Sequence, residues 1–138
     1  MDKKVPIQWG GYYTSQKEDG PYGVFRLLDF TSEAYHAAIF QEKFTTLPTW
    51  SDVQNLEPFI GHAPISSLQF YHQEMKLIGS IPLKAEDLEG YELYLDHFQY
   101  SREEIEEIRG NLLHNSQLGP LMVMLSLIDD KLQVQTVP

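Results

Sequence analysis

Alternation of apolar and polar side chains predicts strands in the first part of the chain. Residues 5–13 are expected to form a short strand with turns, and Pro6 and the Gly10-Gly11 pair restrict it to a sheet edge or a bulge. Residues 22–30 are rich in aromatic and branched side chains that alternate along the segment. This pattern predicts a second strand.

The next segment, residues 31–44, fits two structures. Ser32 could cap a helix, and the alanines that follow would favour one. In an extended chain, by contrast, successive side chains from Tyr35 to Phe40 fall alternately on two sides, and residues 31–33 form the preceding turn. We favour the strand.

Little periodicity is visible in residues 45–67, which contain three prolines. We expect a long ordered loop, a kind of segment that is often functional in small domains. Residues 70–81 are then expected to form a turn and a short strand at 76–78, ended by Gly79.

Helical periodicity is strong from Asp87 to Phe98. At 100° per residue one side of this helix is apolar and the opposite side is acidic; the apolar side comprises Leu88, Tyr91, Tyr94, Leu95 and Phe98, and the acidic side Glu86, Glu89, Glu92 and Asp96. A second helix is expected from Ser101, which forms a capping box with Glu104. Residues 121–128 and 132–137 are then typical of a terminal hairpin around Asp129-Asp130.

These elements predict one domain over residues 1–138, with no internal repeat and no linker. The helices come late and do not alternate with the strands, which argues against a parallel α/β fold. We therefore predict an α+β fold: a curved, mostly antiparallel sheet with two acidic amphipathic helices packed on one side.

Charge narrows the possible partners. The net charge is −10, which disfavours binding to a nucleic acid backbone and favours a basic protein partner. The absence of cysteine fits a reducing compartment. No apolar stretch approaches the length of a membrane span, and no signal peptide is apparent, so a cytoplasmic protein that does not bind membranes is expected.

Catalytic motifs are missing from the sequence. The five histidines lack the spacing of a zinc site, and no serine elbow or phosphate-binding glycine loop occurs. We therefore expect no cofactor and no metal, and we assign no catalytic residue.

Acidic residues concentrate in one segment, which is the first candidate site. Residues 84–109 contain nine of the twenty acids and only three bases. Leu93 is expected on the acidic side of its helix, where an apolar side chain ringed by acids could anchor a partner. Alternatively, a charged helix face is only solvated. The predicted partner-binding residues are Glu86, Glu89, Glu92, Leu93 and Asp96.

A small-molecule or enzymatic site is the alternative. It would lie between the sheet and the 45–67 loop, lined by His36, His62, Trp50 and Tyr22. A histidine in a rigid loop such as that around His62 more often bonds a neighbouring carbonyl than a ligand.

Three segments of the chain are familiar together: residues 35–44 with 47–49, residues 60–66, and residues 86–95. In this order they resemble a group of small bacterial proteins that look like immunity proteins of polymorphic toxin systems. This resemblance implies a mixed α/β domain with a strand around His36, and a toxin as the basic partner. It implies no catalytic residues.

Overall fold

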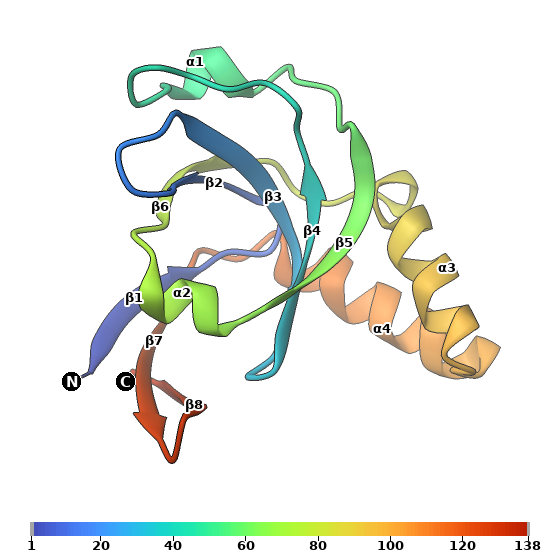
Figure 1. Ribbon diagram of the computed structural model, residues 1–138. Coiled ribbons are helices and arrows are strands. Elements are labelled where there is room, and N and C mark those ends of the chain that lie inside the picture. Colours follow the sequence, from blue (N-terminus) through green and yellow to red (C-terminus); the bar gives the residue numbers. More distant parts are fainter. Residues whose placement is uncertain (1, 138) are drawn as a thin grey trace.

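Eight antiparallel strands form two sheets in the computed structural model, which describes residues 2–137 (Figure 1). The predicted α+β class is confirmed, although the strands form two sheets and not one. One sheet has the order β1-β7-β8 and the other the order β5-β4-β3-β2-β6. The strands are β1 (Lys3–Ile7), β2 (Gly11–Gln16), β3 (Tyr22–Phe30), β4 (Ala34–Ile39), β5 (Ile60–Ser66), β6 (Lys76–Ser80), β7 (Leu121–Ile128) and β8 (Lys131–Thr136).

The single strand predicted over residues 5–13 is instead two strands in different sheets. Gly10 lies between them with φ +81°, a conformation that side chains other than glycine rarely adopt. The chain changes direction there, so that β1 pairs with β7 and β2 pairs with β3. The terminal hairpin is confirmed: β7 pairs with β8, and both residues of its turn have positive φ.

The loop predicted over residues 45–67 is wrong in part. It contains the short helix α1 (Trp50–Val53) and all of β5. Pro64 concealed this strand, because proline lacks the N–H that a central strand needs. β5 lies at the edge of its sheet, where a missing donor is tolerated.

The segment before β6 also contains a helix, α2 (Leu68–His72), where a turn was expected. Gly79 does not end β6 but pairs with Tyr12 inside it. A Cβ at Gly79 would lie 2.3 Å from the Trp50 ring, so the glycine lets the indole rest on the strand.

Both late helices form as predicted, preceded by a 3-10 turn, η1 (Ala85–Leu88). They are α3 (Glu89–His97) and α4 (Arg102–Asn115), and Figure 1 shows both on one side of the curved larger sheet. The Ser101 hydroxyl accepts the N–H of Glu104, whose carboxylate accepts the Ser101 N–H, which confirms the capping box. No helix among residues 2–137 is long and apolar enough to cross a membrane.

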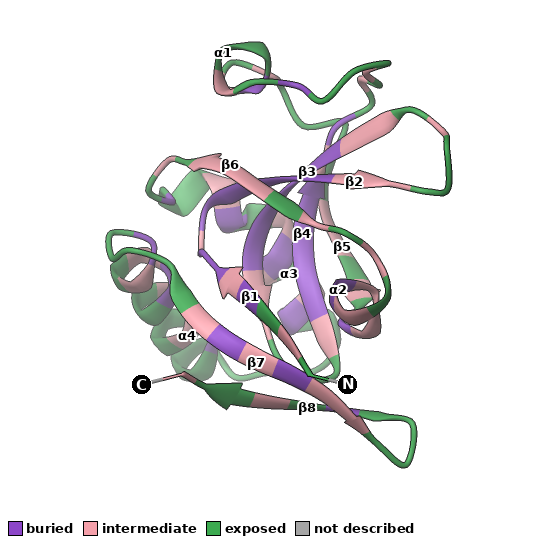
Figure 2. Cartoon of the chain, turned by 90° about the vertical axis from the view of Figure 1, so that its left-hand side faces the viewer, coloured by how far each residue is buried: buried purple, intermediate pink, exposed green. Residues whose placement is uncertain are grey.

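The central strands β3 and β4 of the larger sheet are buried on both faces (Figure 2), which explains the nearly continuous apolar run of β3. One face packs against the smaller sheet and α2 and holds Tyr13, Phe25 and Leu27. The opposite face lies under α1, η1, α3 and α4 and holds Tyr12 and Leu28. All of the site features described below lie on this second face or on the helices that cover it.

Candidate functional site

The predicted partner-binding residues of α3 lie together on a shallow groove of about 560 Å³ between α3 and α4. Leu93 is 72% exposed, as its place on the acidic side of the helix predicted. The buried side chain of Ile105 belongs to the lining as well. We call this surface the acidic groove; it is lined by Glu89, Glu92, Leu93, Asp96, Arg102 and Ile105.

One acid of this groove already has a cation. Arg109 Nε donates to Glu92 Oε2 at 2.9 Å, and its Nη2 donates to Glu92 Oε1. A bidentate pair of this kind joins α3 to α4 and fixes the wall of the groove. Glu92 therefore has a structural partner, whereas Glu89 and Asp96 have no cation within 4 Å among residues 2–137.

Glu86 lies on η1 and lines a different hollow, together with Glu89. Phe98 also departs from its prediction. It was expected on the buried side of the helix but is 58% exposed, because α3 ends at His97 and Phe98 has left the helical path.

His36 and His62 come together although 26 residues separate them. His36 Nδ1 and His62 Nε2 are 2.8 Å apart, so one ring donates a hydrogen bond and the other accepts it. The rings stack on each other and on Tyr91 of α3, with centroids 4.4 Å apart for His36 and Tyr91. The Tyr91 hydroxyl in turn donates to Asp29 Oδ2 at 2.7 Å.

Burial keeps this histidine pair uncharged. Burial, followed by repulsion from His36, lowers the pKa of His62 from 6.5 to about 4. Burial also lowers the pKa of His36, and the nearby Asp29 carboxylate opposes that effect only in part. The pKa of Tyr91 is raised by burial and by the charge of Asp29. At neutral pH the pair is therefore a neutral hydrogen-bonded contact between the sheet and α3.

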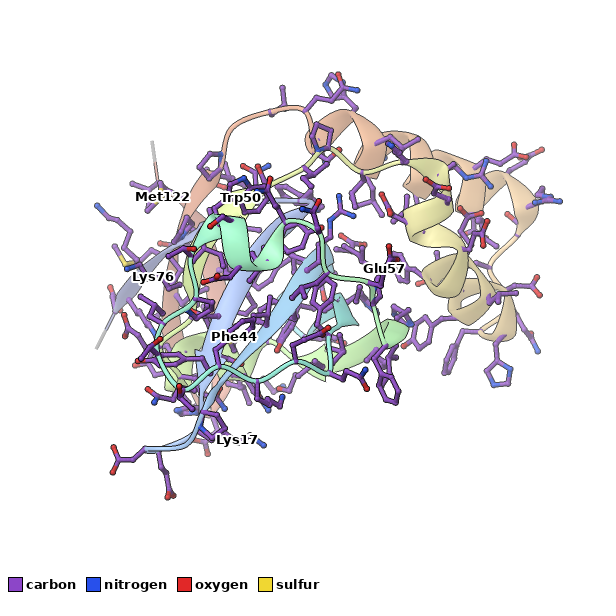
Figure 3. All side chains as sticks on the ribbon, turned by 90° about the horizontal axis from the view of Figure 1, so that it is seen from above. Lys17, Phe44, Trp50, Glu57, Lys76 and Met122 are labelled. Atoms are coloured by element: carbon purple, nitrogen blue, oxygen red, sulfur yellow. The ribbon has the colours of Figure 1, made fainter. Side chains whose placement is uncertain are left out.

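Trp50 and Tyr22 are not near the histidines, so the structure does not assemble the predicted four-residue pocket. Trp50 packs edge-on against Tyr12, and Tyr22 forms a bridge with Phe44. In Figure 3 both Trp50 and Phe44 are well separated from α3. The prediction failed because it placed residues 45–67 in one loop, whereas α1 and β5 carry Trp50 and His62 to different parts of the sheet.

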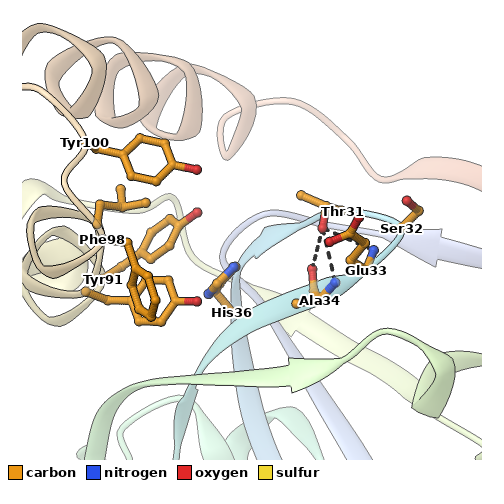
Figure 4. Close-up of a pocket in the computed structure, with 10 residues that line it drawn as sticks. Thr31, Ser32, Glu33, Ala34, His36, Tyr91, Phe98 and Tyr100 are labelled. Carbon is orange, nitrogen blue, oxygen red and sulfur yellow. Dashed lines mark hydrogen bonds between the residues drawn. The ribbon is translucent and has the colours of Figure 1, made fainter.

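His36 lines a cleft of about 520 Å³ that opens between α3 and the turn before β4 (Figure 4). Tyrosines form most of the α3 wall, and small polar residues form the opposite wall. We call it the tyrosine cleft; it is lined by Thr31, Ser32, Glu33, Ala34, His36, Tyr91, Tyr94, Leu95, Phe98 and Tyr100.

A larger cavity of about 630 Å³ lies between the sheet and the segment 54–61, roughly where the alternative site was predicted. None of the four predicted side chains lines it. Its buried charge is Arg26, whose Nη1 lies 3.2 Å from Asp87 Oδ1. The guanidinium also lies over the Tyr12 ring at 5.3 Å from the centroid. We call this hollow the Arg26 cavity.

Sequence reasoning missed Arg26, although a signal existed. It stands alone as a charge within the apolar strand 22–28, and such a charge must find partners when it is buried. Its partners are the carbonyls of Gly10 and Ile81, at 3.3 and 2.7 Å, besides Asp87. These groups hold Arg26 in place in the wall of the cavity.

Comparison with known proteins gives no relative: no protein-family model, no curated protein and no solved structure matches this chain. Among residues 2–137, no three histidine, aspartate or glutamate side chains are grouped so that they could hold a metal ion.

Proposed function

We propose that this protein is a non-enzymatic protein-binding module that docks the acidic groove on a basic protein partner, as an immunity-type inhibitor does with its toxin. The observation that carries the proposal is Leu93, which is 72% exposed in a groove whose unpaired acids, among residues 2–137, are Glu89 and Asp96 and whose lining also includes Arg102. An exposed apolar side chain among charged residues matches the anatomy of an interface, where a desolvated anchor is surrounded by polar contacts.

Two physical effects support this function. Negative charge concentrated on one side accelerates association with a basic partner. Covering the Leu93 side chain then contributes about 1.5–3 kcal/mol, the usual value for burying a leucine. The Glu92–Arg109 pair holds α3 and α4 together, so the groove needs little reorganisation on binding.

Inhibition would be steric. A basic toxin whose active site attracts phosphate presents positive charge around that site, and an acidic module that covers it excludes the substrate. The mechanism needs no catalytic group on this chain, in keeping with the sequence, in which we assigned none.

The test compares two charge reversals of equal size. The variant Glu89→Lys/Asp96→Lys changes the groove and leaves the Glu92–Arg109 pair intact, whereas Asp19→Lys/Glu74→Lys changes exposed acids on other elements. Each protein is immobilised and exposed to extracts of its own host cells, and retained proteins are identified by mass spectrometry.

We expect a basic protein that the unaltered chain and the control variant retain and that the groove variant loses. The association rate of that protein should also fall with increasing salt. If both reversals weaken capture equally, the effect is one of net charge alone and the proposed groove is wrong.

A second candidate function is small-molecule binding in the tyrosine cleft. It is favoured by the position of His36, which lines the cleft and is hydrogen-bonded to His62 behind it. Melting temperatures measured with pools of metabolites test it, because a ligand that binds the folded state raises the melting temperature. The increase should disappear in a Tyr94→Ala variant, in which the cleft loses one wall.

A further inference from the structure

The Arg26 cavity adjoins the acidic groove. Glu89 lines both hollows, so one carboxylate belongs to two neighbouring walls. The floor of the cavity consists of buried side chains of the sheet, among them Tyr12, Ala38 and Phe40. Its volume of about 630 Å³ falls in the usual range of ligand pockets.

Charge in the cavity is unevenly distributed. In its wall, Arg26 and Asp87 form an ion pair and balance each other. At its exposed rim, Glu57, Glu86 and Glu89 have no cation within 4 Å among residues 2–137. Figure 3 shows Glu57 on the side of the molecule where α3 lies.

This imbalance selects the sign of the ligand. With Arg26 and Asp87 balanced, the remaining lining charges are three glutamates and Lys84, a net charge of −2. Low-dielectric walls strengthen the field of such charges at the mouth of a cavity. An anion would therefore be repelled there, and a cation attracted.

We infer that the Arg26 cavity receives one arginine side chain of the basic partner, and this inference rests on the proposed function. The aliphatic stem would cover the apolar floor, and the guanidinium would lie against the rim glutamates. Arginine suits this place better than lysine, because its planar group presents five donors that can be divided among several carboxylates.

The distance between the contact at Leu93 and the contact at Glu89 follows from the geometry of α3. Leu93 follows Glu89 by four residues, or about 6 Å along the axis of α3. An extended segment advances about 3.3 Å per residue, so the partner's arginine should lie about two positions along the chain from its apolar residue over Leu93, with one residue between them. The recognised element is then a short basic strand or loop.

The probe for the cavity is N-acetylarginine amide, followed by NMR through the backbone amides of Gly61 and Gly90, which both line the cavity. N-acetylcitrulline amide has nearly the same shape without the charge. N-acetylglutamic acid α-amide, which keeps its side-chain carboxylate, has the opposite charge. We expect saturable shifts with the arginine compound and at least about tenfold weaker binding of the citrulline compound.

A matched pair of variants places the binding in the cavity. An added Cβ at Gly61 or at Gly119 meets no atom within 4 Å, so both sites accept a larger side chain, but only Gly61 lines the cavity. Gly61→Phe should abolish binding and Gly119→Phe should not. In case Gly61→Phe fails to fold, Glu57→Gln/Glu86→Gln should weaken binding about tenfold without changing the volume of the cavity.

Equal binding of arginine and citrulline compounds would overturn the inference, as would preferred binding of the glutamic compound or full binding to Gly61→Phe. The proposed function fails separately. If Gly61→Phe still retains the partner and Glu89→Lys/Asp96→Lys does not, the docking function stands and the arginine pocket is wrong. If the cavity binds the arginine probe but partner capture is independent of Glu89 and Asp96, the acidic-groove function is wrong.

Discussion

Acid should destabilise this protein through the His36–His62 contact, and the structure sets the size of the effect. The folded state holds the pKa of His62 at about 4, below the value of 6.5 in an unfolded chain. Above about pH 6.5 the ring is neutral in both states. Between these two values the unfolded chain binds a proton that the folded chain excludes, so the free energy of unfolding falls as the pH falls.

The magnitude follows from the two pKa values. At about 1.4 kcal/mol per pKa unit, a decrease from 6.5 to about 4 corresponds to about 3 kcal/mol. Because the His62 ring is only partly buried, solvent screening reduces the expected contribution to about 1–2 kcal/mol. Carboxylates also lose their charge in this range, and a comparison of variants is needed to remove their contribution.

Urea unfolding at about pH 7.5 and about pH 4.5 measures the effect. His62→Gln keeps a polar group but cannot be protonated, so its loss of stability between the two pH values should be about 1–2 kcal/mol smaller than that of the unaltered protein. His114→Gln, at an exposed position of α4, is the control and should follow the unaltered protein. If the three proteins lose stability in parallel, the histidine contact is not a pH-dependent element and the reasoning is refuted.

Three substitutions test other parts of the structure. Leu93→Asp should change the free energy of unfolding by no more than about 0.5 kcal/mol from that of the unaltered protein, because the side chain is exposed. The same variant should no longer capture the basic partner. A large loss of stability would show that Leu93 belongs to the core. Ser101→Ala should cost about 1 kcal/mol in urea unfolding because α4 loses its N-terminal cap to Glu104, and an unchanged midpoint would contradict this. Gly79→Val should lower the free energy of unfolding by about 1–3 kcal/mol, because the new side chain overlaps the Trp50 ring. Adding Trp50→Ala to that variant should restore part of the lost stability. No recovery would indicate a different cause.

Local patterns in the sequence predicted the elements whose structure depends on residues close to one another along the chain. β3 and the capping box of α4 formed as expected, as did the extended course of β4, whose side chains alternate between the two faces of the larger sheet. In these segments periodicity and local hydrogen bonds decide the structure, and both are visible along the chain.

Tertiary context decided the remaining elements. Residues 60–66 were predicted as part of a loop, and Pro64 is compatible with a strand there only because β5 lies at the edge of its sheet. The separation of the strands into two sheets likewise depends on pairs such as Val5 with Val123, which no local pattern reveals.

Of the candidate sites, one could be predicted from local spacing and the other could not. Helical spacing alone placed Glu89, Leu93 and Asp96 on one surface. The Arg26 cavity needs contributions from distant parts of the chain, including the sheet, the segment 54–61 and η1. The spacing of residues within one segment holds no information about such an assembly.

The pairing of β1 with β7 has a consequence for how the molecule reaches its native state. Joining Val5 to Val123 closes a loop of about 120 residues, which costs about 4 kcal/mol in chain entropy before any contact repays it. The helices and the hairpins of the larger sheet need no such closure. The pairing of β1 with β7 should therefore form last, and on the ribosome β1 has no partner strand until β7 has emerged from the exit tunnel.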